Sequence, residues 1–306
     1  MDELLAALAT LVPAHREVEP LAGDASHRRF FRVHRSDGGT IVACLYPEGG
    51  AAQATADHDV QRWGWSRGLP IPRPLGVRGR VTVSEDLGEE DLAGAAADGL
   101  EIGGPVLDAL AAFQRTHWGG LPTPPFDAAF FRRELARFER AAWPGLPASP
   151  PDVAGFLDTL AADLGRHPLR LVHRDFHANN LFLHGGRVRA VDFQDMRAGP
   201  DTYDAASLLR ERGGERVIAD PEAWVRMAAA RLGWSPGWPD RFVACAAQRG
   251  LKVIGTFLRL AGEGKARYLT LLDEVQRHTL VALAELDAPE RLRVAVARSR
   301  EPERGV

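Results

Sequence analysis

Two short stretches of the sequence carry side chains that could do chemistry on a hydroxyl group. Residues 173–180 read HRDFHANN, and residues 191–195 read VDFQD further along the chain. A carboxylate such as that of Asp175 can orient an acceptor hydroxyl and take its proton. Asn180 and Asp192 offer amide and carboxylate oxygens, the ligand atoms that Mg²⁺ prefers when it neutralises a triphosphate. Together the three side chains indicate phosphoryl transfer.

The spacing within these stretches supports that interpretation. Asn180 lies five residues after Asp175, as in the kinase pattern H-R-D-x-x-x-x-N, and Asp192 stands in a D-F-x position. The competing interpretation is a zinc pair, because His173 and His177 have the i, i+4 spacing of H-E-x-x-H. That motif needs a glutamate where this chain has an arginine, and a helix where the flanking residues favour strands. We therefore expect His173 to pack beneath the loop.

Composition narrows the possible functions. The chain has 306 residues and a net charge of −3, so its overall charge does not favour nucleic acid binding. Of its 38 basic residues only Lys252 and Lys265 are lysines, and neither lies in a Walker A loop. Cys44 and Cys245 are too few for a disulfide framework or a four-cysteine zinc site. With no secretory signal and no apolar run of membrane-spanning length, we expect a cytoplasmic globular protein.

The first third of the chain predicts a small antiparallel sheet with one helix against it. Residues 21–46 favour strand, turn, strand, turn and strand, and Ser36-Asp37-Gly38-Gly39 reads as a hairpin turn. Alternation puts Arg28, Phe30 and Arg32 on one face of the sheet. Other expected elements are a packing helix at 2–12, a helix at about 51–67, a proline-rich connection at 69–76 and a strand at about 80–88.

After Gly88 the pattern changes to long helices. We expect them at about 103–117, 127–142, 152–165, 203–212, 220–232, 238–262 and 265–286. Residues 169–195 form a β-rich island whose short strands are joined by the turn Gly185-Gly186. The sequence therefore predicts an α+β, bilobal fold, with an antiparallel-sheet N-lobe at 1–86 and a mainly helical C-lobe at 87–290. Residues 291–306 are expected to fray.

The sequence resembles the aminoglycoside phosphotransferase/choline kinase-like superfamily, whose small-molecule kinases share the bilobal protein-kinase fold. Within it, the chain looks most like the N-acetylmuramate/N-acetylglucosamine anomeric kinases. The matching stretches are 23–33, 84–88, 173–182, 191–212 and 248–269, which run through nearly the whole chain. The resemblance implies an enzyme that uses ATP and Mg²⁺ to phosphorylate the anomeric hydroxyl of an N-acetylated amino sugar in cell-wall sugar recycling. The implied partners are a nucleotide and a small sugar, without nucleic acid or membrane.

Carried over position by position, the resemblance makes Asp175 the catalytic base and Asn180 and Asp192 the metal ligands. Residues 23–26 become a hairpin turn over the nucleotide phosphates, for which ordinary turn chemistry is the alternative. Residues 85–87 become the hinge between the lobes, whose backbone would pair with adenine; the alternative is a solvated loop. The implied nucleotide-binding residues in these two segments are Asp24, Ala25, Ser26, Glu85 and Leu87.

One departure concerns the lysine that kinases place at the phosphates. The pattern V-A-I-K falls on Val42-Ala43-Cys44-Leu45, which puts Leu45 in the position of the lysine. We expect an arginine to supply the missing charge, and Arg28 and Arg32 lie on one strand face beside the predicted phosphate turn. The alternatives are a solvated strand face for these arginines and a kinase-like fold that binds nucleotide without transferring phosphate.

The phosphoryl acceptor is expected on the C-lobe near Asp175. Candidate acceptor-binding residues are His177, Asn179, Asp195, Tyr203, Arg210 and Lys252. Lys252 and Arg249 share a predicted helix and could reach an acidic group of the substrate, or else form a surface salt bridge. Asp204 could cap the helix that follows or brace the catalytic loop.

The charges on the acceptor side bear on the choice of acceptor. An aminoglycoside is a polycation and needs many carboxylates around it. The segments named above mix aspartate with arginine, lysine and histidine, which fits a neutral or anionic sugar better. An aminoglycoside, choline or a different sugar remains the alternative acceptor.

Overall fold

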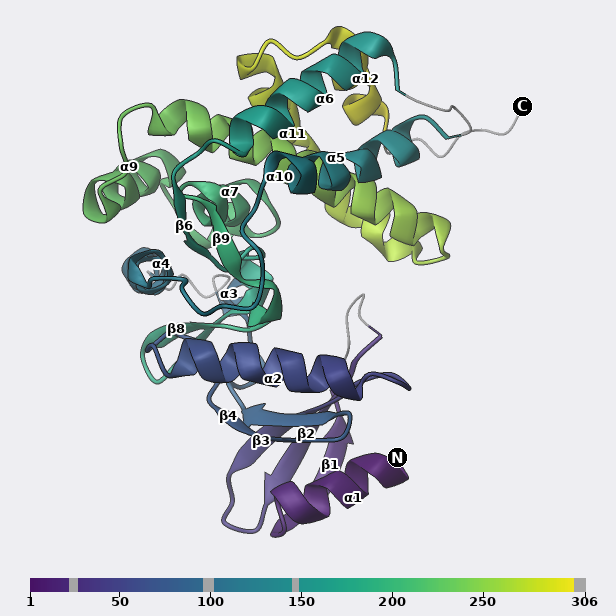
Figure 1. Cartoon of the computed structure of the whole chain (residues 1–306), viewed down its shortest axis with the longest axis vertical. Coiled ribbons are helices and arrows are strands. Elements are labelled where there is room, and N and C mark those ends of the chain that lie inside the picture. Colours follow the sequence, from purple (N-terminus) through teal and green to yellow (C-terminus); the bar gives the residue numbers. More distant parts are fainter. Residues whose placement is uncertain (22–26, 96–101, 145–148, 300–306) are drawn as a thin grey trace.

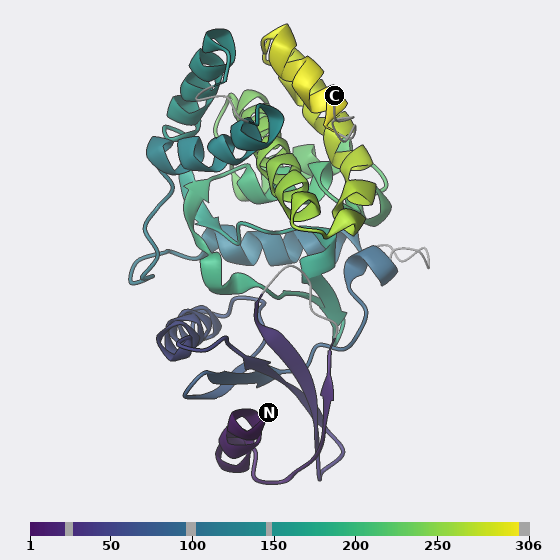
Figure 2. The same ribbon diagram turned by 90° about the vertical axis from the view of Figure 1, so that its right-hand side faces the viewer.

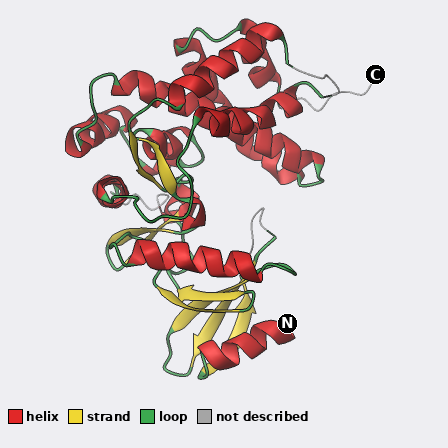
Figure 3. Cartoon of the chain, in the orientation of Figure 1, coloured by secondary structure: helices red, strands yellow, loops and turns green. Residues whose placement is uncertain are grey.

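The computed structural model describes residues 1–21, 27–95, 102–144 and 149–299. Its two lobes stand one above the other along the long axis, with strands concentrated in the lower lobe and helices in the upper one (Figure 1, Figure 3). A quarter turn about the vertical axis shows the same division (Figure 2). The predicted α+β, bilobal fold is therefore confirmed.

The N-lobe is an antiparallel sheet of five strands in the order β1-β2-β3-β5-β4. Its strands are β1 (His15–Pro20), β2 (Arg29–Arg35), β3 (Thr40–Leu45), β4 (Pro74–Arg78) and β5 (Val81–Glu85). Helix α1 (Asp2–Leu11) covers one face, where Leu4 and Leu8 pack with Phe31 and Val33. Helix α2 (Ala51–Trp65) covers the other, where Ala54 packs with residues of β3. In Figure 1 this places α2 between the sheet and the C-lobe.

Two strands at the sheet edges differ from the predictions. The first strand, β1, occupies residues 15–20, before the segment in which we expected it. Its alternating charged residues hide a strand signal, because an edge strand buries little of either face. At the other edge, β4 begins at Pro74 inside the predicted connection. Proline is tolerated at the first residue of an edge strand, where its missing N–H costs no ladder hydrogen bond.

The C-lobe is built around the long helix α10, which packs against α5, α7 and α11. Its helices are α3 (Leu92–Ala95), α4 (Gly103–Arg115), α5 (Ala128–Ala142), α6 (Pro151–Leu164), α7 (Tyr203–Arg210), α8 (Gly214–Val217), α9 (Pro221–Leu232), α10 (Trp238–Gly262), α11 (Leu272–Glu285) and α12 (Glu290–Arg298). Local signals set several of their ends. For example, the side chain of Asp127 accepts a hydrogen bond from the Phe130 N–H and caps α5.

The end of the chain corrects two expectations. The helix expected over 265–286 begins as a 3₁₀ segment, η4 (Ala266–Leu271), which α11 then continues. Residues 290–298, most of which were expected to fray, form α12. The fully buried side chains of Leu292 and Val296 hold this helix against the C-lobe. Its charged residues suggested a solvated tail because only this narrow apolar stripe faces the protein.

The predicted β island consists of two small antiparallel pairs. One pair is β6 (Leu169–Val172) with β9 (Arg197–Pro200), and the other is β7 (Leu181–His184) with β8 (Arg187–Ala190). Gly185 and Gly186 join β7 to β8 with φ angles of 58° and 74°, left-handed values that favour glycine. The catalytic loop therefore leaves one pair at β6 and enters the other at β7.

Both cysteines are buried and unpaired. Cys44 lies in the N-lobe against α2, and Cys245 lies on α10 with an exposed fraction of 0%. Burial raises the pKa of each thiol to about 12, so both are protonated at neutral pH. No helix among the described residues is long and apolar enough to cross a membrane.

Candidate active site

The loop that carries Asp175 is fixed from beneath by Asp204, in the first turn of α7. The two carboxylate oxygens of Asp204 accept the backbone N–H groups of His173 at 2.6 Å and Arg174 at 3.0 Å. Asp204 is fully buried, and burial raises its pKa to about 7 although the two donors favour its ionised form. His173 packs edge-on against Phe113, with ring centroids 5.4 Å apart. The bracing role considered for Asp204 and the packing role expected for His173 are both observed.

The Asp175 carboxylate is held by two cations from α10. Its Oδ1 accepts from Lys252 Nζ at 3.0 Å and from Arg249 Nη2 at 3.1 Å. Burial alone would raise the pKa of Asp175, but the charges of Lys252 and then Arg249 outweigh it and hold that pKa well below 3.8. Lys252 is only 7% exposed, so this ion pair is not the surface salt bridge that we considered.

Arg249 is the buried centre of this arrangement. Its side chain is 1% exposed and bonds to the Glu211 carboxylate, to the Arg174 carbonyl and, at 3.0 Å, to the Tyr203 hydroxyl. Its guanidinium also lies 4.9 Å from the centre of the Tyr203 ring. These contacts and the bond to Asp175 use four of the five N–H donors of Arg249. Because its side chain is also buried, Arg249 fixes Asp175 and offers little surface to an acidic substrate group.

The two proposed metal ligands lie at the ends of the β7–β8 hairpin. The side-chain N–H of Asn180 donates to the Asp175 carbonyl at 2.9 Å. The amide oxygen of the same side chain is therefore left as the atom that could ligate a metal. Asn180 also pairs through its backbone carbonyl with the Val191 N–H at 2.9 Å. That bond places Asp192 beside it. Asp192 has a left-handed φ of 62°, and its side chain is 39% exposed.

Arg28 reaches Asp192 from the N-lobe. Its Nη2 lies 2.9 Å from Asp192 Oδ1, and its Nη1 lies 3.6 Å from the Asp57 carboxylate on α2. The Tyr46 hydroxyl holds Asp57 through a 2.7 Å hydrogen bond. Arg28 thus pairs with a helix carboxylate, as the lysine of a kinase pairs with the glutamate of its helix, and it also contacts Asp192.

Leu45 does not occupy the position that we gave it. Its side chain belongs to the apolar cluster beneath α1, on the face of the sheet away from α2. Successive strand residues point to opposite faces, so an alignment shifted by one residue moves a side chain to the wrong side. Cys44 of β3 and Tyr46, directly after β3, face α2 together with Phe30 of β2.

Arg32 is not brought to the same place as Arg28. It is 6% exposed and donates to the Asp86 carboxylate, with its Nε 2.7 Å from Oδ2. It also pairs with Glu89. Both carboxylates belong to the linker after β5, so Arg32 ties the sheet to the linker, which corrects its expected phosphate role.

The predicted hinge residues are placed as follows. The Glu85 carboxylate accepts from Arg189 Nη2 at 2.7 Å and from the Arg73 backbone N–H at 2.9 Å, so its side chain is structural. Leu87 is 7% exposed. Within the described part of the chain, no hydrogen bond uses the backbone N–H or carbonyl of Leu87. Asp24, Ala25 and Ser26 lie outside the described residues.

Some expected acceptor contacts are taken up within the protein. Tyr203 is fully buried and serves Arg249, so it has no surface to offer a substrate. The guanidinium of Arg210 packs 5.5 Å from the ring centre of Phe242, two helical turns before Arg249 on α10, and is not brought to Asp175. The Asn179 side chain donates to the Asp91 carboxylate at 3.0 Å and ties the loop to the segment before α3.

Two other expected acceptor residues stay close to Asp175. His177 is 8% exposed, and burial lowers its pKa to about 4, so it is neutral at pH 7. The Asp195 carboxylate lies 2.6 Å from Arg174 Nη1, yet its side chain is half exposed and keeps accepting capacity. Arg174 itself has a φ of 83° and also pairs with the buried Glu134 at 3.1 Å.

Sequence reasoning missed Asp57 and Glu211, which hold the two key arginines. Asp57 is one of the buried positions 54, 57, 58, 61 and 64 of α2, a stripe with helical spacing. An acid in such a stripe is a signal that could have been found. Glu211 gave no signal, because its partner Arg249 is 38 residues away in the chain.

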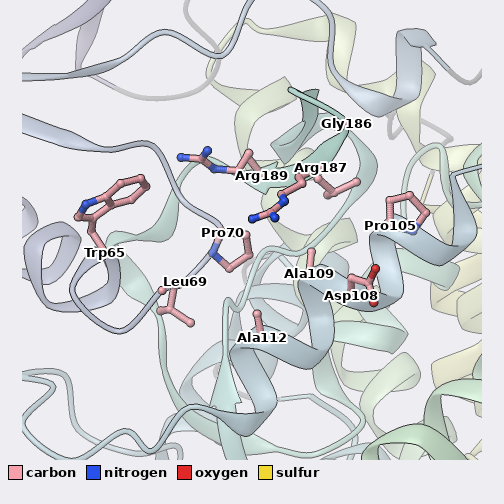
Figure 4. A pocket seen from close by; sticks show the side chains of 12 residues that line it. Trp65, Leu69, Pro70, Pro105, Asp108, Ala109, Ala112, Gly186, Arg187 and Arg189 are labelled. Atoms are coloured by element: carbon pink, nitrogen blue, oxygen red, sulfur yellow. The ribbon is translucent and has the colours of Figure 1, made fainter.

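The structure also has a pocket of about 530 Å³ (Figure 4). Its lining comes from the end of α2, residues 68–70, one face of α4 and the β7–β8 hairpin. None of the predicted site residues lines it. Trp65, Pro70 and Arg189 lie on one side and Pro105 and Asp108 on the other.

Comparisons with known proteins agree with this geometry. The phosphotransferase enzyme family matches residues 17–241 of the chain. An N-acetylmuramate/N-acetylglucosamine kinase of Pseudomonas aeruginosa is 30% identical over 293 residues, which cover 88% of this chain and 84% of that protein. A protein of the same name from Neisseria meningitidis is 38% identical over 121 residues, 37% of this chain and 36% of that protein.

Solved structures share the fold at low sequence identity. Choline kinase LicA from Streptococcus pneumoniae has a TM-score of 0.65 at 14% identity, over 91% of this chain and 96% of that one. Amicoumacin kinase hAmiN, in complex with AMP-PNP, Ca²⁺ and Ami, has a TM-score of 0.61 at 15% identity, over 82% of this chain and 86% of that one. The family match spans most of the chain, and a kinase relative aligns along nearly all of it. The chain therefore belongs to the phosphotransferase enzyme family and is a phosphotransferase that acts on a hydroxyl acceptor.

Proposed function

We propose that the chain is a sugar kinase, which transfers the γ-phosphoryl group of ATP to the anomeric hydroxyl of an N-acetylated amino sugar. The observation that carries this proposal is the alignment along 88% of the chain with an N-acetylmuramate/N-acetylglucosamine kinase. A third protein with that name, from Pseudomonas putida, aligns along 81% of the chain at 28% identity. The product, a sugar 1-phosphate, would enter the recycling of cell-wall amino sugars.

The proposed nucleotide site uses residues from both lobes. Arg28 would bind the phosphates, because a guanidinium offers several N–H donors in a planar fork. The backbone of Leu87, which makes no hydrogen bond within the described residues, would meet the adenine at the linker. The complex of the solved hAmiN structure with AMP-PNP supports an ATP-like nucleotide for this fold.

The donor set fits a magnesium ion bound together with phosphates. No cluster of three or more histidine, cysteine or acidic side chains among the described residues could hold a metal unaided. The oxygens of Asn180 and Asp192 are two hard ligands, and Mg²⁺ in kinases takes one or two protein oxygens plus substrate phosphates and water. When bound, the ion would neutralise charge on the phosphates.

Asp175 is the proposed base. Every hydrogen bond to its carboxylate within the described residues ends on Oδ1, which leaves Oδ2 for the acceptor hydroxyl. As the acceptor oxygen forms its bond to the γ-phosphorus, the bond from that phosphorus to the β–γ bridging oxygen breaks. The hydroxyl proton passes to Asp175, and ADP leaves. An anomeric hydroxyl suits a carboxylate of low basicity, because the ring oxygen makes it more acidic than an ordinary alcohol.

The test is ATP consumption by the purified chain over a panel of acceptors, with ³¹P NMR of the product. We expect turnover with N-acetylmuramate or N-acetylglucosamine and a phosphorus signal coupled to the anomeric proton. Asp175→Asn should lower kcat by about 10³-fold or more. Asp240→Asn, at an exposed aspartate of α10, is the matched control and should leave kcat unchanged.

Two results would contradict the proposal. Turnover restricted to aminoglycosides or to choline would replace the sugar with another acceptor. A product phosphorylated at a different hydroxyl would exclude the anomeric position.

A further inference from the structure

The two cations on Asp175 Oδ1 are not equivalent. Arg249 uses four of its five N–H donors, in bonds to Glu211, the Arg174 carbonyl, Tyr203 and Asp175. Lys252 has three N–H donors, and within the described residues only the one to Asp175 is used. A side chain that is 9% exposed has little water to satisfy the other two. The structure therefore leaves a nearly buried ammonium with donors to spare beside the proposed base.

The position of Lys252 relates it to the reacting atoms. Its Nζ is 3.0 Å from Asp175 Oδ1, while the acceptor hydroxyl would bind the other oxygen of the same carboxylate. In a reactive arrangement the acceptor oxygen and the phosphorus are about 3–3.5 Å apart. This distance is short enough for an equatorial oxygen of the phosphoryl group to come within hydrogen-bond range of Nζ. Charge spreads over these oxygens during transfer, and a compact ammonium can stabilise it.

We propose that Lys252 is a catalytic residue, whose ammonium binds the phosphoryl group from the acceptor side during transfer while Arg28 binds it from the nucleotide side. The proposal rests on the role of Asp175 given above, but it does not depend on which acceptor is used. It also replaces the expected contact of Lys252 with an acidic substrate group.

The first experiment compares ground-state and transition-state ligands without any acceptor. Binding of ADP, with Mg²⁺ and either with or without fluoroaluminate, is measured by calorimetry for the wild type and for Lys252→Met. We expect the variant to bind ADP alone within about twofold of wild type and to lose about 10²–10³-fold in affinity for the fluoroaluminate complex. Lys252→Arg, which keeps the charge, should recover part of this loss. Equal affinity of the wild type and a folded Lys252→Met for the complex would overturn the proposal.

The matched control uses the other lysine of the chain. Lys265 is exposed at the start of η4, and Lys265→Met should bind both ligands like the wild type. Melting curves establish whether Lys252→Met is folded, because it leaves the buried Glu134 and Asp175 with fewer cations nearby.

A second experiment needs no substitution. An acyl phosphate of ATP carries a reactive carbonyl on its terminal phosphate. A lysine amine that reaches this group attacks the carbonyl, forms an amide and releases ATP. Peptide mass spectrometry should find Lys252 acylated, with excess ATP preventing it, and any acylation of Lys265 unaffected by ATP. Acylation of Lys265 alone would count against the proposal. A wrong acceptor changes neither experiment, so failure of this inference and failure of the sugar assignment are distinguishable.

Discussion

Arg28 and Asp192 join the two lobes through a 2.9 Å ion pair between residues 164 positions apart in the chain. The same guanidinium lies 3.6 Å from Asp57 of α2. One arginine therefore fixes the position of the N-lobe helix relative to the segment after β8. This position between two carboxylates supports the proposal that Arg28 supplies the charge of the lysine that the third strand lacks.

Removal of this guanidinium should impair nucleotide use. We expect Arg28→Ala to lower kcat/KM for ATP by about 10²-fold, because it removes a charge that would stabilise the phosphates. Asp57→Asn should lower it less, and Asp59→Asn, at an exposed neighbour on α2, should not change it. Steady-state kinetics with ATP as the varied substrate measure all three. Wild-type kcat and KM in Arg28→Ala would show that another group supplies the charge.

Arg32 should matter for stability. Its guanidinium and the Asp86 carboxylate have side chains that are 8% and 4% exposed. Loss of one partner leaves a buried charge unpaired, so Arg32→Met should lower the free energy of unfolding by about 3 kcal/mol. The double variant Arg32→Met, Asp86→Leu should cost less than the sum of the two single changes. Urea denaturation provides these values, and additive losses would contradict a direct pair.

The brace beneath the catalytic loop gives a third prediction. Asp204→Asn keeps the shape of the side chain but replaces one acceptor oxygen with an N–H₂ group that faces a backbone donor. We expect the free energy of unfolding to fall by about 1–3 kcal/mol. Because the loop carries Asp175, kcat should fall as well. Unfolding curves and initial rates check this. An unaltered kcat would show that the hydrogen bonds between Asp204 and the loop do not set the position of Asp175.

A pH dependence of stability follows from Glu215 of α8, which pairs with Arg277 and His278 of α11. The hydrogen bond from Arg277 is the largest cause that lowers its pKa from 4.5 to about 2, with burial opposing and His278 assisting. A depressed acid pKa gives stability that is fully present above pH 4.5 and is lost as the pH falls toward 2. The side chain is 46% exposed, so we expect less than about 1 kcal/mol.

Glu215→Gln tests this sign. The free energy of unfolding of the variant should be lower than that of the wild type at pH 7, and the difference should shrink at pH 3. Glu222→Gln, at a side chain that is 79% exposed, is the control. A difference that grows toward acid would contradict the assignment.

Most of the chemistry was predictable because it is local in the sequence. Asp175 and Asn180 share one loop, and Asp192 follows a hairpin whose two glycines announce the turn. The three roles stay predictions, but the structure does bring these residues together. The α+β, bilobal arrangement followed from the helical spacing of the C-lobe and the alternation in β2, while the resemblance to small-molecule kinases implied the protein-kinase fold.

The partners of these residues were harder to predict because they depend on tertiary packing. Lys252 and Arg249 were expected near a substrate, yet they meet Asp175 more than 70 residues earlier in the chain. Their contact depends on how α10 docks, which periodicity alone does not determine. Leu45 shows a different limit. Successive side chains of a strand point to opposite faces, so an alignment that is uncertain by one residue does not determine which face a side chain occupies.

The burial of both cysteines has a practical consequence. Protonated thiols enclosed in the two lobes react slowly with maleimides, so a cysteine introduced on the surface would be labelled selectively. Helices α1 and α12 lie at opposite ends of the long axis (Figure 1). A dye pair on the exposed faces of these helices would report the separation of the lobes by energy transfer, and would show whether nucleotide binding changes it.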